Sequence, residues 1–592
     1  MNENFFRILV VDLATGKARV EKMAGRERAA GGSGLAALLF ERFGDPGQPW
    51  DNPEQPFILA IGPLTGLFPL MSKTVSAYIS PYHNQYTESH AGGRSALALR
   101  FAGYDGLVLR GRAPVLSCLA IGGHHVRLRP VDFMAGMDVL RSGKLLRRMF
   151  SSGSGHRSIL RIGPAGENGS AMACINVDTY RHFGRLGGGT VLGNKNIKGI
   201  VLCGEESIPI PERREYAKLF AHVYGLVTGT DMLRKYHNLG TPANLAHLND
   251  IEALPWQNLQ KTRDSRITGV TGARFADEAL LRNGACSGCP VGCIHIGFIR
   301  QRFEEEDNRY LYHQVAYDYE PIFAAGTMLG LDSTFAVLRV LDVMEKQGLD
   351  AMSAGVALAW ATEAAQKGLV SERETTVPLS FGDTSAYVRA VELLASGANE
   401  FYRLLSQGTL ACAGRYGGEE FACVLGQEMA GYATGEVFFT AQALGFRHSH
   451  LDTGAYSYEQ KHPERDLDAA LSFLINDEPG RCLLTSMVSC LFARSVYTPE
   501  LLAQCLRVSG FTALADNVDT LGEAVRRHRW QLRFATGFRP EDIVLPKRFY
   551  RVRNWKGTVD ADFLDRLKTE YGRRLAELAQ GGPANREEKS HE

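Results

Sequence analysis

The stretch Cys286-Ser-Gly-Cys289-Pro-Val-Gly-Cys293 stands between a first part of the chain rich in short apolar runs and a second part rich in helical periods. Its C-x2-C-x3-C spacing suits a [4Fe–4S] cluster, which four cysteine thiolates normally hold. Three closely spaced ligands therefore predict a fourth from elsewhere in the fold. The alternative is a zinc ion with His295 as the fourth ligand. We favour the cluster because zinc sites usually come as two separated C-x2-C pairs.

The fourth ligand must come from the remaining cysteines. These are Cys118, Cys174, Cys203, Cys412, Cys423, Cys482, Cys490 and Cys505. A single cysteine is more often a small buried apolar residue than a ligand. Spacing alone therefore does not choose among the eight.

The apolar pattern divides the chain into a β-rich part and a helical part. Short apolar runs bounded by turn residues predict strands at 8–13, 57–61, 106–109, 159–162 and 199–202. Residues 332–346 instead show a helical period, with Asp332 or Ser333 at the start and Gly348 at the stop. The expected fold class is α+β, with a β-rich N-terminal domain followed by two mainly α-helical domains.

We expect four segments. Residues 1–206 form the β-rich domain, 207–415 a helical domain with the cysteine triplet, 416–580 a second helical domain, and 581–592 a disordered tail. The boundary near 415 rests on the glycine-rich stretch Gly414-Arg-Tyr-Gly-Gly418. The tail is polar and has almost nothing to bury.

Composition restricts the class of protein. The 592 residues include 66 basic and 65 acidic ones, a net charge of +1, which argues against a nucleic-acid partner. There is no run of about 18 apolar residues, so we expect no membrane span. The N-terminus lacks the features of a signal peptide, and eleven cysteines are too few for a disulfide scaffold in so long a chain. We expect a cytoplasmic protein.

Three glycine-rich turns in the first domain indicate a large phosphorylated ligand. They are Gly31-Gly-Ser-Gly34, Gly92-Gly-Arg94 and Arg185-Leu-Gly-Gly-Gly189. Such loops expose backbone N–H groups, and Arg94 and Arg185 could neutralise a phosphate. None fits the dinucleotide or P-loop pattern, and each alone is as well explained as a simple turn.

Taken together, these segments resemble the tungsten-dependent aldehyde:ferredoxin oxidoreductase family over nearly the whole chain. The resemblance rests on several motifs in a fixed order. They are Gly31-Gly-Ser-Gly-Leu-Ala36, Ile61-Gly-Pro-Leu-Thr-Gly66, Gly92-Gly-Arg94 with Phe101-Ala-Gly-Tyr-Asp105, Ile162-Gly-Pro-Ala-Gly-Glu-Asn168, Gly184-Arg-Leu-Gly-Gly-Gly-Thr-Val-Leu-Gly-Asn-Lys-Asn-Ile-Lys198, the cysteine triplet, Tyr319-Glu320, Gly348-Leu-Asp350 and Cys490.

The resemblance implies a tungsten, or alternatively molybdenum, bis-molybdopterin cofactor on the β-rich domain, with the two helical domains closing over it. It also implies a [4Fe–4S] cluster and a magnesium ion between the pterin phosphates. The implied reaction converts an aldehyde and water to a carboxylic acid. The electrons would pass to ferredoxin or an iron–sulfur subunit, and a homodimer is compatible with the resemblance.

For the cluster, the resemblance assigns Cys286, Cys289, Cys293 and, as the fourth ligand, Cys490. The family motif D-x-x-G-L-C corresponds to Thr485-Ser-Met-Val-Ser-Cys490, which keeps only the cysteine. Its companion D-x-x-G-L-D corresponds to Glu345-Lys-Gln-Gly-Leu-Asp350. The residues that the resemblance places at the pterins are Lys73, His90, Gly92, Gly93, Arg94, Arg185, Gly187, Glu345, Leu349, Asp350 and Thr485.

Two of these positions depart from the family, as does Ser33, which replaces an arginine. Lys73 stands for an arginine that meets the cofactor phosphate, and His90 stands for an asparagine. Lysine and histidine can bind phosphate as point charges but not as a bidentate fork. The departures therefore imply cofactor binding through altered contacts.

For catalysis the resemblance points to Glu320 and to the segment that holds His448, His450 and Asp452. A carboxylate can activate water, and a carboxylate beside a histidine can form a proton relay. The alternative readings are a helix N-terminal charge for Glu320 and a polar turn with one structural histidine. Two other functions stay open: an aryl-CoA reductase-type catalytic subunit, and a zinc-stabilised binding protein without catalysis.

Overall fold

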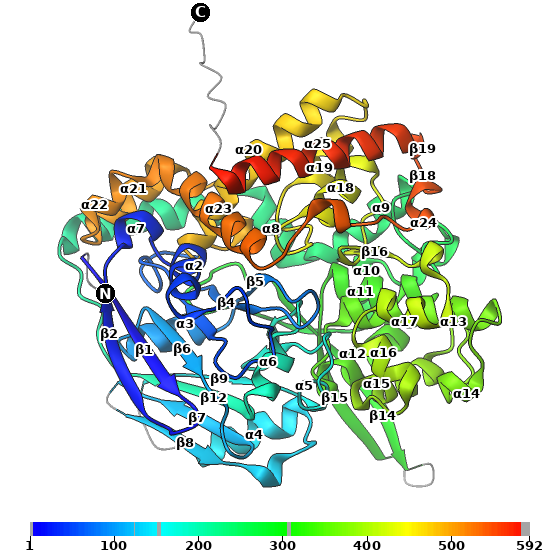
Figure 1. Cartoon of the computed structure of the whole chain (residues 1–592), viewed down its shortest axis with the longest axis horizontal. Coiled ribbons are helices and arrows are strands. Elements are labelled where there is room, and N and C mark those ends of the chain that lie inside the picture. Colours follow the sequence, from blue (N-terminus) through cyan, green and yellow to red (C-terminus); the bar gives the residue numbers. More distant parts are fainter. Residues whose placement is uncertain (1–3, 124, 151–154, 305–308, 582–592) are drawn as a thin grey trace, which may run out of the picture.

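The N-terminal domain contains two six-stranded mixed sheets (Figure 1). The computed structural model describes residues 4–123, 125–150, 155–304 and 309–581. The first sheet has the order β2 (Ala18–Met23), β1 (Phe6–Asp12), β6 (Gly106–Arg110), β3 (Phe57–Ala60), β4 (Thr74–Ile79), β5 (Tyr86–Ala91). The second has the order β11 (Arg181–Phe183), β10 (Ile175–Val177), β9 (His156–Arg161), β12 (Ile197–Gly204), β7 (Ser117–Ile121), β8 (Val126–Pro130).

Strand β1 of the first sheet is buried on both faces, whereas the edge strand β2 is largely exposed. Alternate side chains of a strand point to opposite faces. Ile8 and Val10 pack with helix α2 (Gly32–Phe43), whereas Leu9 and Val11 join the apolar core that also contains side chains of the second sheet. The near-continuous apolar run 8–13 is therefore a strand covered on both sides.

The rest of the chain is mainly helical, as the sequence predicts, so the α+β class is confirmed. A small antiparallel sheet flanks the cysteine triplet: β13 (Leu280–Gly284) precedes it, and β14 (Ile294–Glu304) and β15 (Arg309–Tyr317) follow it. The longer helices are α7 (Arg213–Thr228), α8 (Asp231–Asn238), α12 (Thr334–Gln347), α13 (Ala351–Gln366), α15 (Thr384–Ser396), α17 (Thr409–Tyr416), α18 (Glu436–Leu444), α20 (Leu467–Ser486), α21 (Pro499–Val508), α23 (Val518–Ala535) and α25 (Ala561–Gln580).

Helix α12 lies where the periodicity predicts a helix. Ser333 is its N-cap, and Gly348 ends it with a φ of 72°, a left-handed conformation that glycine adopts at little cost. Leu349 and Asp350 follow at once, and Asp350 caps the next helix, α13. This turn carries two of the predicted pterin neighbours.

One expected segment boundary lies between two elements, and the other lies inside a helix. Residue 206 lies between β12 and α7, whereas residue 415 lies inside α17. Residues 582–592, which make up most of the expected disordered tail, lie outside the described residues.

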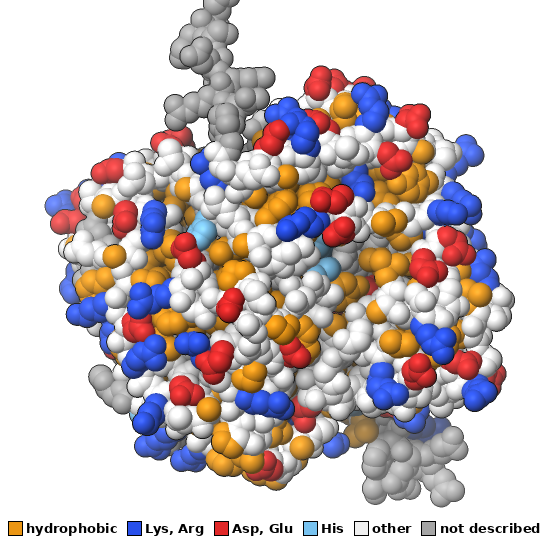
Figure 2. Space-filling model, in the orientation of Figure 1, with side chains coloured by type: hydrophobic (Ala, Val, Ile, Leu, Met, Phe, Trp, Pro, Cys, Tyr) orange, Lys and Arg blue, Asp and Glu red, His pale blue; other side chains and the backbone are white. Residues whose placement is uncertain are grey.

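Among the described residues, no single helix is long and apolar enough to cross a membrane. One pair passes that test jointly, namely 319–329 with Thr334–Gln347, but the two parts are bent by 110°. On the face seen in Figure 2, acidic and basic side chains are interspersed, in keeping with a net charge of +1.

Candidate active site

A cavity of about 790 Å³ lies where the first domain meets the helical part. Its lining comes from β5 and the segment 181–186 of the first domain, and from the cysteine triplet, the start of α11 (Tyr319–Ala325) and the segments around 450 and 490. Ligand sites in proteins commonly have volumes of about 300–1,000 Å³. The cavity is therefore large enough for a substantial cofactor.

All four predicted cluster cysteines line this cavity, and each is half-buried. Leu70 holds the two parts of the set together. Its N–H donates to the Gly288 carbonyl inside the triplet loop, at 3.4 Å, and its carbonyl accepts from the N–H of Cys490, at 3.0 Å. Residue 70 of the first domain thus joins the triplet to the fourth cysteine.

The backbone of the first domain approaches one of the cysteines closely at Gly92. A Cβ on Gly92 would lie 2.6 Å from Cys286 Sγ, so only glycine fits there. Among the described residues, no three His, Cys, Asp or Glu side chains are close enough to hold one metal ion. The four cysteines are therefore not gathered around a single ion in this structure.

His295 does not complete a zinc set. Its side chain is buried, with Nε2 2.9 Å from the Asn238 carbonyl oxygen and Nδ1 3.2 Å from the Cys293 carbonyl oxygen. Both ring nitrogens therefore lie against backbone carbonyls. The alternative reading of the triplet as a zinc site is not supported.

Two cations lie against the cysteines. Arg181 Nη2 is 3.6 Å from Cys293 Sγ. Burial acts to raise the pKa of Cys286, but Arg181 and Lys73 outweigh it and lower that pKa. Burial raises the pKa of Cys289 to about 11 and that of Cys293 to about 12. Burial would lower the pKa of Lys73, but Cys490 and Cys286 raise it, so this residue stays cationic.

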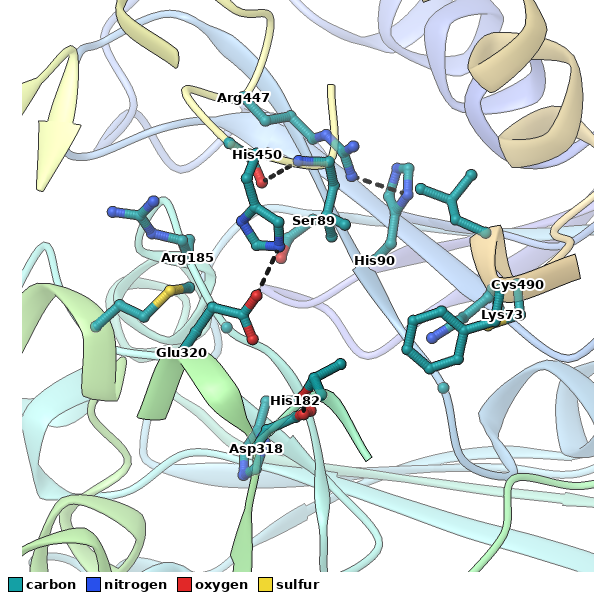
Figure 3. A pocket seen from close by; sticks show the side chains of 18 of the residues that line it. Lys73, Ser89, His90, His182, Arg185, Asp318, Glu320, Arg447, His450 and Cys490 are labelled. Atoms are coloured by element: carbon teal, nitrogen blue, oxygen red, sulfur yellow. Dashed lines mark hydrogen bonds and ion pairs between the residues drawn. The ribbon is translucent and has the colours of Figure 1, made fainter. Parts of the chain in front are cut away.

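Glu320 enters the cavity from the first turn of α11. Its Oε1 accepts a hydrogen bond from the Tyr432 hydroxyl at 2.8 Å and lies 2.9 Å from His450 Nε2 (Figure 3). Burial acts to raise the pKa of Glu320, but His450 and Tyr432 hold it below its ordinary value. His450 Nδ1 is buried without a hydrogen-bond partner among the described residues. The pair thus combines an ionised carboxylate with a ring nitrogen still available to a ligand.

Asp318 is a second carboxyl group in the same wall. It caps α11 and accepts hydrogen bonds from the Tyr319 N–H and the Thr241 hydroxyl. Burial, and after it the charge of Glu320, raises the pKa of Asp318 to about 7. Two neighbouring carboxyls with divergent pKa values are a usual arrangement for proton transfer.

The structure does not join His448, His450 and Asp452 into one relay. His448 Nε2 lies 2.6 Å from Arg533 Nη2, and its Nδ1 lies 2.9 Å from the Ala443 carbonyl oxygen. Burial, and then Arg533, lowers the pKa of His448. Asp452 accepts from Arg447 Nε at 2.7 Å. Of the three, only His450 lines the cavity.

The predicted pterin residues separate into two groups. Those that line the cavity are Lys73, His90, Gly92, Arg185, Glu345, Leu349, Asp350 and Thr485. Gly93, Arg94 and Gly187 lie outside the lining, and the side chain of Arg94 is exposed. Gly187 instead begins helix α6 (Gly188–Asn194) with a φ of 78°, where a Cβ would meet Pro81 at 2.3 Å.

Arg185 contacts two residues of the helical part, and Glu345 pairs with a histidine. Arg185 Nε lies 3.4 Å from Asp350 Oδ2, and its Nη2 donates to the Glu428 carbonyl at 2.5 Å. Glu345 lies 2.7 Å from His182 Nε2. Burial acts to raise the pKa of Glu345, but His182 outweighs it and lowers that pKa.

A buried polar network runs from the cavity into the helical part. Glu88 pairs with Arg529 at 2.9 Å and with His90 at 3.1 Å. It also accepts from the Ser33 hydroxyl at 2.8 Å, which in turn lies 3.0 Å from Thr485 Oγ1. Burial, with the charge of Arg447 second, lowers the pKa of His90 to about 4, so this imidazole is neutral near pH 7.

Several site residues lack a sequence motif of their own. Sequence reasoning missed Arg181, His182, Asp318, Tyr432 and Arg447. Three of these residues lie next to motifs that the sequence does show. Arg181 and His182 closely precede the Gly184 motif, and Asp318 lies two residues before Glu320. Tyr432 and Arg447 reach the cavity only through the tertiary fold.

Comparison with protein families covers both parts of the chain. A model described as aldehyde ferredoxin oxidoreductase, N-terminal domain, matches residues 8–204. A second, described as aldehyde ferredoxin oxidoreductase, domains 2 & 3, matches residues 218–578. The two matches leave only short segments of the chain uncovered.

Individual relatives agree with the family match. The tungsten-containing aldehyde ferredoxin oxidoreductase of Pyrococcus furiosus is 26% identical over 572 residues, covering 93% of this chain and 92% of the relative. The protein of the same description from Thermococcus kodakarensis is 28% identical over 432 residues, covering 71% and 69%. The active-site complex BamBC of benzoyl-coenzyme A reductase with 1,5-dienoyl-CoA has a TM-score of 0.76 at 18% identity, covering 97% of this chain and 95% of the other, a likeness of fold alone.

Proposed function

The chain belongs to the aldehyde ferredoxin oxidoreductase family, and from this membership we propose that it oxidises an aldehyde with water to a carboxylic acid. The balanced reaction is RCHO + H2O → RCOO⁻ + 3H⁺ + 2e⁻. The observation that carries the proposal is that the ionised Glu320, paired with His450, lines the same cavity as the four cysteines. Proton acceptor and electron exit thus share one site.

We assign the cofactors to groups of lining residues. Lys73, Gly92, Arg185, Asp350 and Thr485 would hold a tungsten, or alternatively molybdenum, bis-pterin group. Two buried nitrogens without partners among the described residues, Arg181 Nε and His450 Nδ1, support the fit, since buried polar atoms normally have partners. When bound, this group supplies the two-electron redox chemistry. A magnesium ion between the pterin phosphates is part of the same proposal.

The side chains of this chain would handle the protons. Glu320 accepts a proton from a water molecule beside the aldehyde carbon, because it is ionised and buried. His450, with Nε2 2.9 Å away, orients the Glu320 carboxylate. Asp318, with a pKa of about 7, holds a second proton in the same wall. Tyr432 keeps the Glu320 carboxylate in place.

The four cysteines would hold a [4Fe–4S] cluster that passes electrons on one at a time. Since the triplet and Cys490 are half-buried, an acceptor can approach them from outside. We propose ferredoxin or an iron–sulfur subunit as that acceptor.

The first test measures the metal content of the protein and its turnover of an aldehyde. We expect protein purified without oxygen to contain tungsten or molybdenum and about four irons per chain, and to reduce a viologen dye with an aldehyde. Metal-loaded protein that ignores every aldehyde but turns over an aryl-CoA thioester would contradict the proposal. Zinc without tungsten, molybdenum or iron would contradict it as well.

Glu320→Gln tests the proton acceptor. We expect kcat to fall by roughly 10²–10⁴-fold with metal content unchanged, because the amide cannot accept the proton. The control is Glu372→Gln, an exposed glutamate in the first turn of α14 (Glu372–Thr375), which should leave kcat unchanged. Normal turnover by the Glu320 variant would make that residue a helix N-terminal charge only.

Cys490→Ala tests the fourth cluster ligand. We expect the iron–sulfur signal in electron paramagnetic resonance to disappear or change its cluster type, because three thiolates remain. Cys412→Ala in α17, far from the cavity lining, should keep the signal. An unchanged spectrum in the Cys490 variant would show that another residue ligates the cluster.

A further inference from the structure

The cavity has an outer wall that none of the proposed chemistry uses. It is built by the loop after His450, by α19 (Ala455–Lys461), by α20 and by the segment after Cys490. Cofactor and cluster residues occupy the other walls. Lys461 and Arg494 of this wall are exposed, so this part of the lining reaches the protein surface and can meet an entering aldehyde.

Aromatic rings of the outer wall stack on one another and on two further rings of the cavity lining, those of Tyr432 and Tyr236. The rings of Tyr432 and Tyr456 are stacked with centroids 4.3 Å apart, and the Tyr432 hydroxyl donates to Glu320. Tyr458 stacks on Phe473, also at 4.3 Å. A further stacked pair in the lining joins Tyr236 and Phe492 at 3.6 Å. Flat apolar walls of this kind favour an aromatic ligand.

Cations stand at the same wall. Arg481 faces Gly454, where a Cβ would lie 3.0 Å from its Nη2 and 3.4 Å from the Phe473 ring. Arg481 Nε is paired with Asp477 at 2.5 Å. Lys461 and Arg494 are exposed and have no carboxylate partner among the described residues. Asp477 thus offsets one of three cations, which leaves this wall positively charged.

The geometry points to a substrate class: an aromatic aldehyde that carries an anionic group on the side away from the formyl carbon. The aromatic pairs would hold the ring, and Arg481, Lys461 and Arg494 would attract the anion. This inference rests on the proposed function, because it assigns a substrate to the same site. It adds a charge requirement that aldehyde oxidation alone does not impose.

The turnover test compares an acid with its neutral isostere. We expect 4-formylbenzoate to have a KM roughly tenfold lower than that of methyl 4-formylbenzoate, with the advantage shrinking as salt rises. The variants Arg481→Gln and Lys461→Gln/Arg494→Gln should each reduce the ratio between the two KM values. The matched controls Lys17→Gln and Arg127→Gln, both exposed in the first domain, should leave the ratio unchanged.

A binding measurement separates this inference from the proposed function. By calorimetry on the metal-loaded protein, benzene-1,4-dicarboxylate should bind more tightly than its neutral diamide, and the cation variants should remove the difference. This result stands even if no aldehyde is oxidised, in which case only the proposed function fails. Equal binding of dianion and diamide, or an unchanged difference in both cation variants, overturns the inference. Cation-dependent binding of benzoyl-CoA alone overturns the assignment of an aldehyde acid.

Discussion

Glu88 is the carboxylate that offsets the buried charge of Arg529 beside the site. It touches Arg529 and His90 directly, and Arg447 Nη1 lies 3.1 Å from the other nitrogen of His90. A buried cation that loses its partner is costly, because the remaining charge is not solvated. Glu88 therefore holds Arg529 and His90 in place near Thr485, while Arg447 has Asp452 as its own partner.

Glu88→Gln should change how stability depends on pH. Burial acts to raise the pKa of Glu88, but Arg529 and His90 lower it to about 2, against 4.5 for an unperturbed glutamate. A lowered folded-state pKa gives stability that is present above pH 4.5 and lost as pH falls toward 2, on the order of 3 kcal/mol. We expect the variant to be less stable at pH 7 and to lose less on acidification.

The measurement is the denaturant midpoint between pH 7 and pH 3, with Glu372→Gln as the control. Parallel curves for the Glu88 variant and the wild type would mean that the ionised carboxylate contributes no net stability.

At this scale the spacing of residues supplied the triplet, and the family resemblance supplied Cys490 and Glu320. All of them line one cavity, and their roles stay predictions. Sequence reasoning could not assign partners to His448 and Asp452, because neighbours in sequence need not face one another. His448 has a φ of 49°, which turns it toward Arg533 and away from His450.

Among the elements, β5 and the turn after it connect the cysteines to the pterin wall. Glu88 and His90 lie on β5, and Gly92 follows one residue after its end. Gly92 approaches Cys286 so closely that the turn tolerates no side chain. Backbone, rather than a side chain, therefore lies against Cys286 at this point.

Gly92→Ala should therefore lower iron content, because the added methyl group would displace Cys286. The control is Gly225→Ala inside α7, where a Cβ meets nothing within 4 Å. That change should stabilise the protein by up to about 1 kcal/mol, since alanine favours helix over glycine. Iron analysis and thermal melting would check both, and full iron content in the Gly92 variant would contradict the close contact.

The predicted strand segments correspond to β1, β3, β6, β9 and β12, yet their order in the sheets was not predictable. In the first sheet β1 lies beside β6, and strand pairing of this kind joins segments distant in sequence. Strands β4 and β5 gave a weaker signal, since Ser76, Glu88 and Ser89 interrupt their apolar pattern. Those polar residues are what the network and the cavity require.

At the scale of the whole molecule, a buried network of ion pairs joins the C-terminal part of the chain to the helical domain. Lys556 Nζ lies 2.9 Å from Glu436 and 2.6 Å from Glu459, and Arg465 Nε lies 2.9 Å from Glu436. Burial raises the pKa of Glu459 despite Lys556. Glu436 and Glu459 therefore depend on both cations, because the loss of Lys556 would leave two buried carboxylates with Arg465 alone.

Lys556→Met should cost about 3–5 kcal/mol, because it leaves two buried carboxylates with one arginine. Adding Glu459→Gln should recover part of that loss by removing one of the charges. Lys17→Met, at an exposed site, is the control. Denaturant unfolding gives the values, and a double variant no more stable than the single one would show that the charges act independently.

The hydrogen bonds of Leu70 to the triplet loop and to Cys490 connect the supply of iron to the lifetime of the protein. One residue of the first domain ties the triplet loop to Cys490 by hydrogen bonds, and a cluster bound there would crosslink these two distant parts of the chain. A ligand that binds only the folded state shifts the folding equilibrium by mass action. Cells starved of iron would consequently hold less of this protein, through faster proteolysis of the unclamped form.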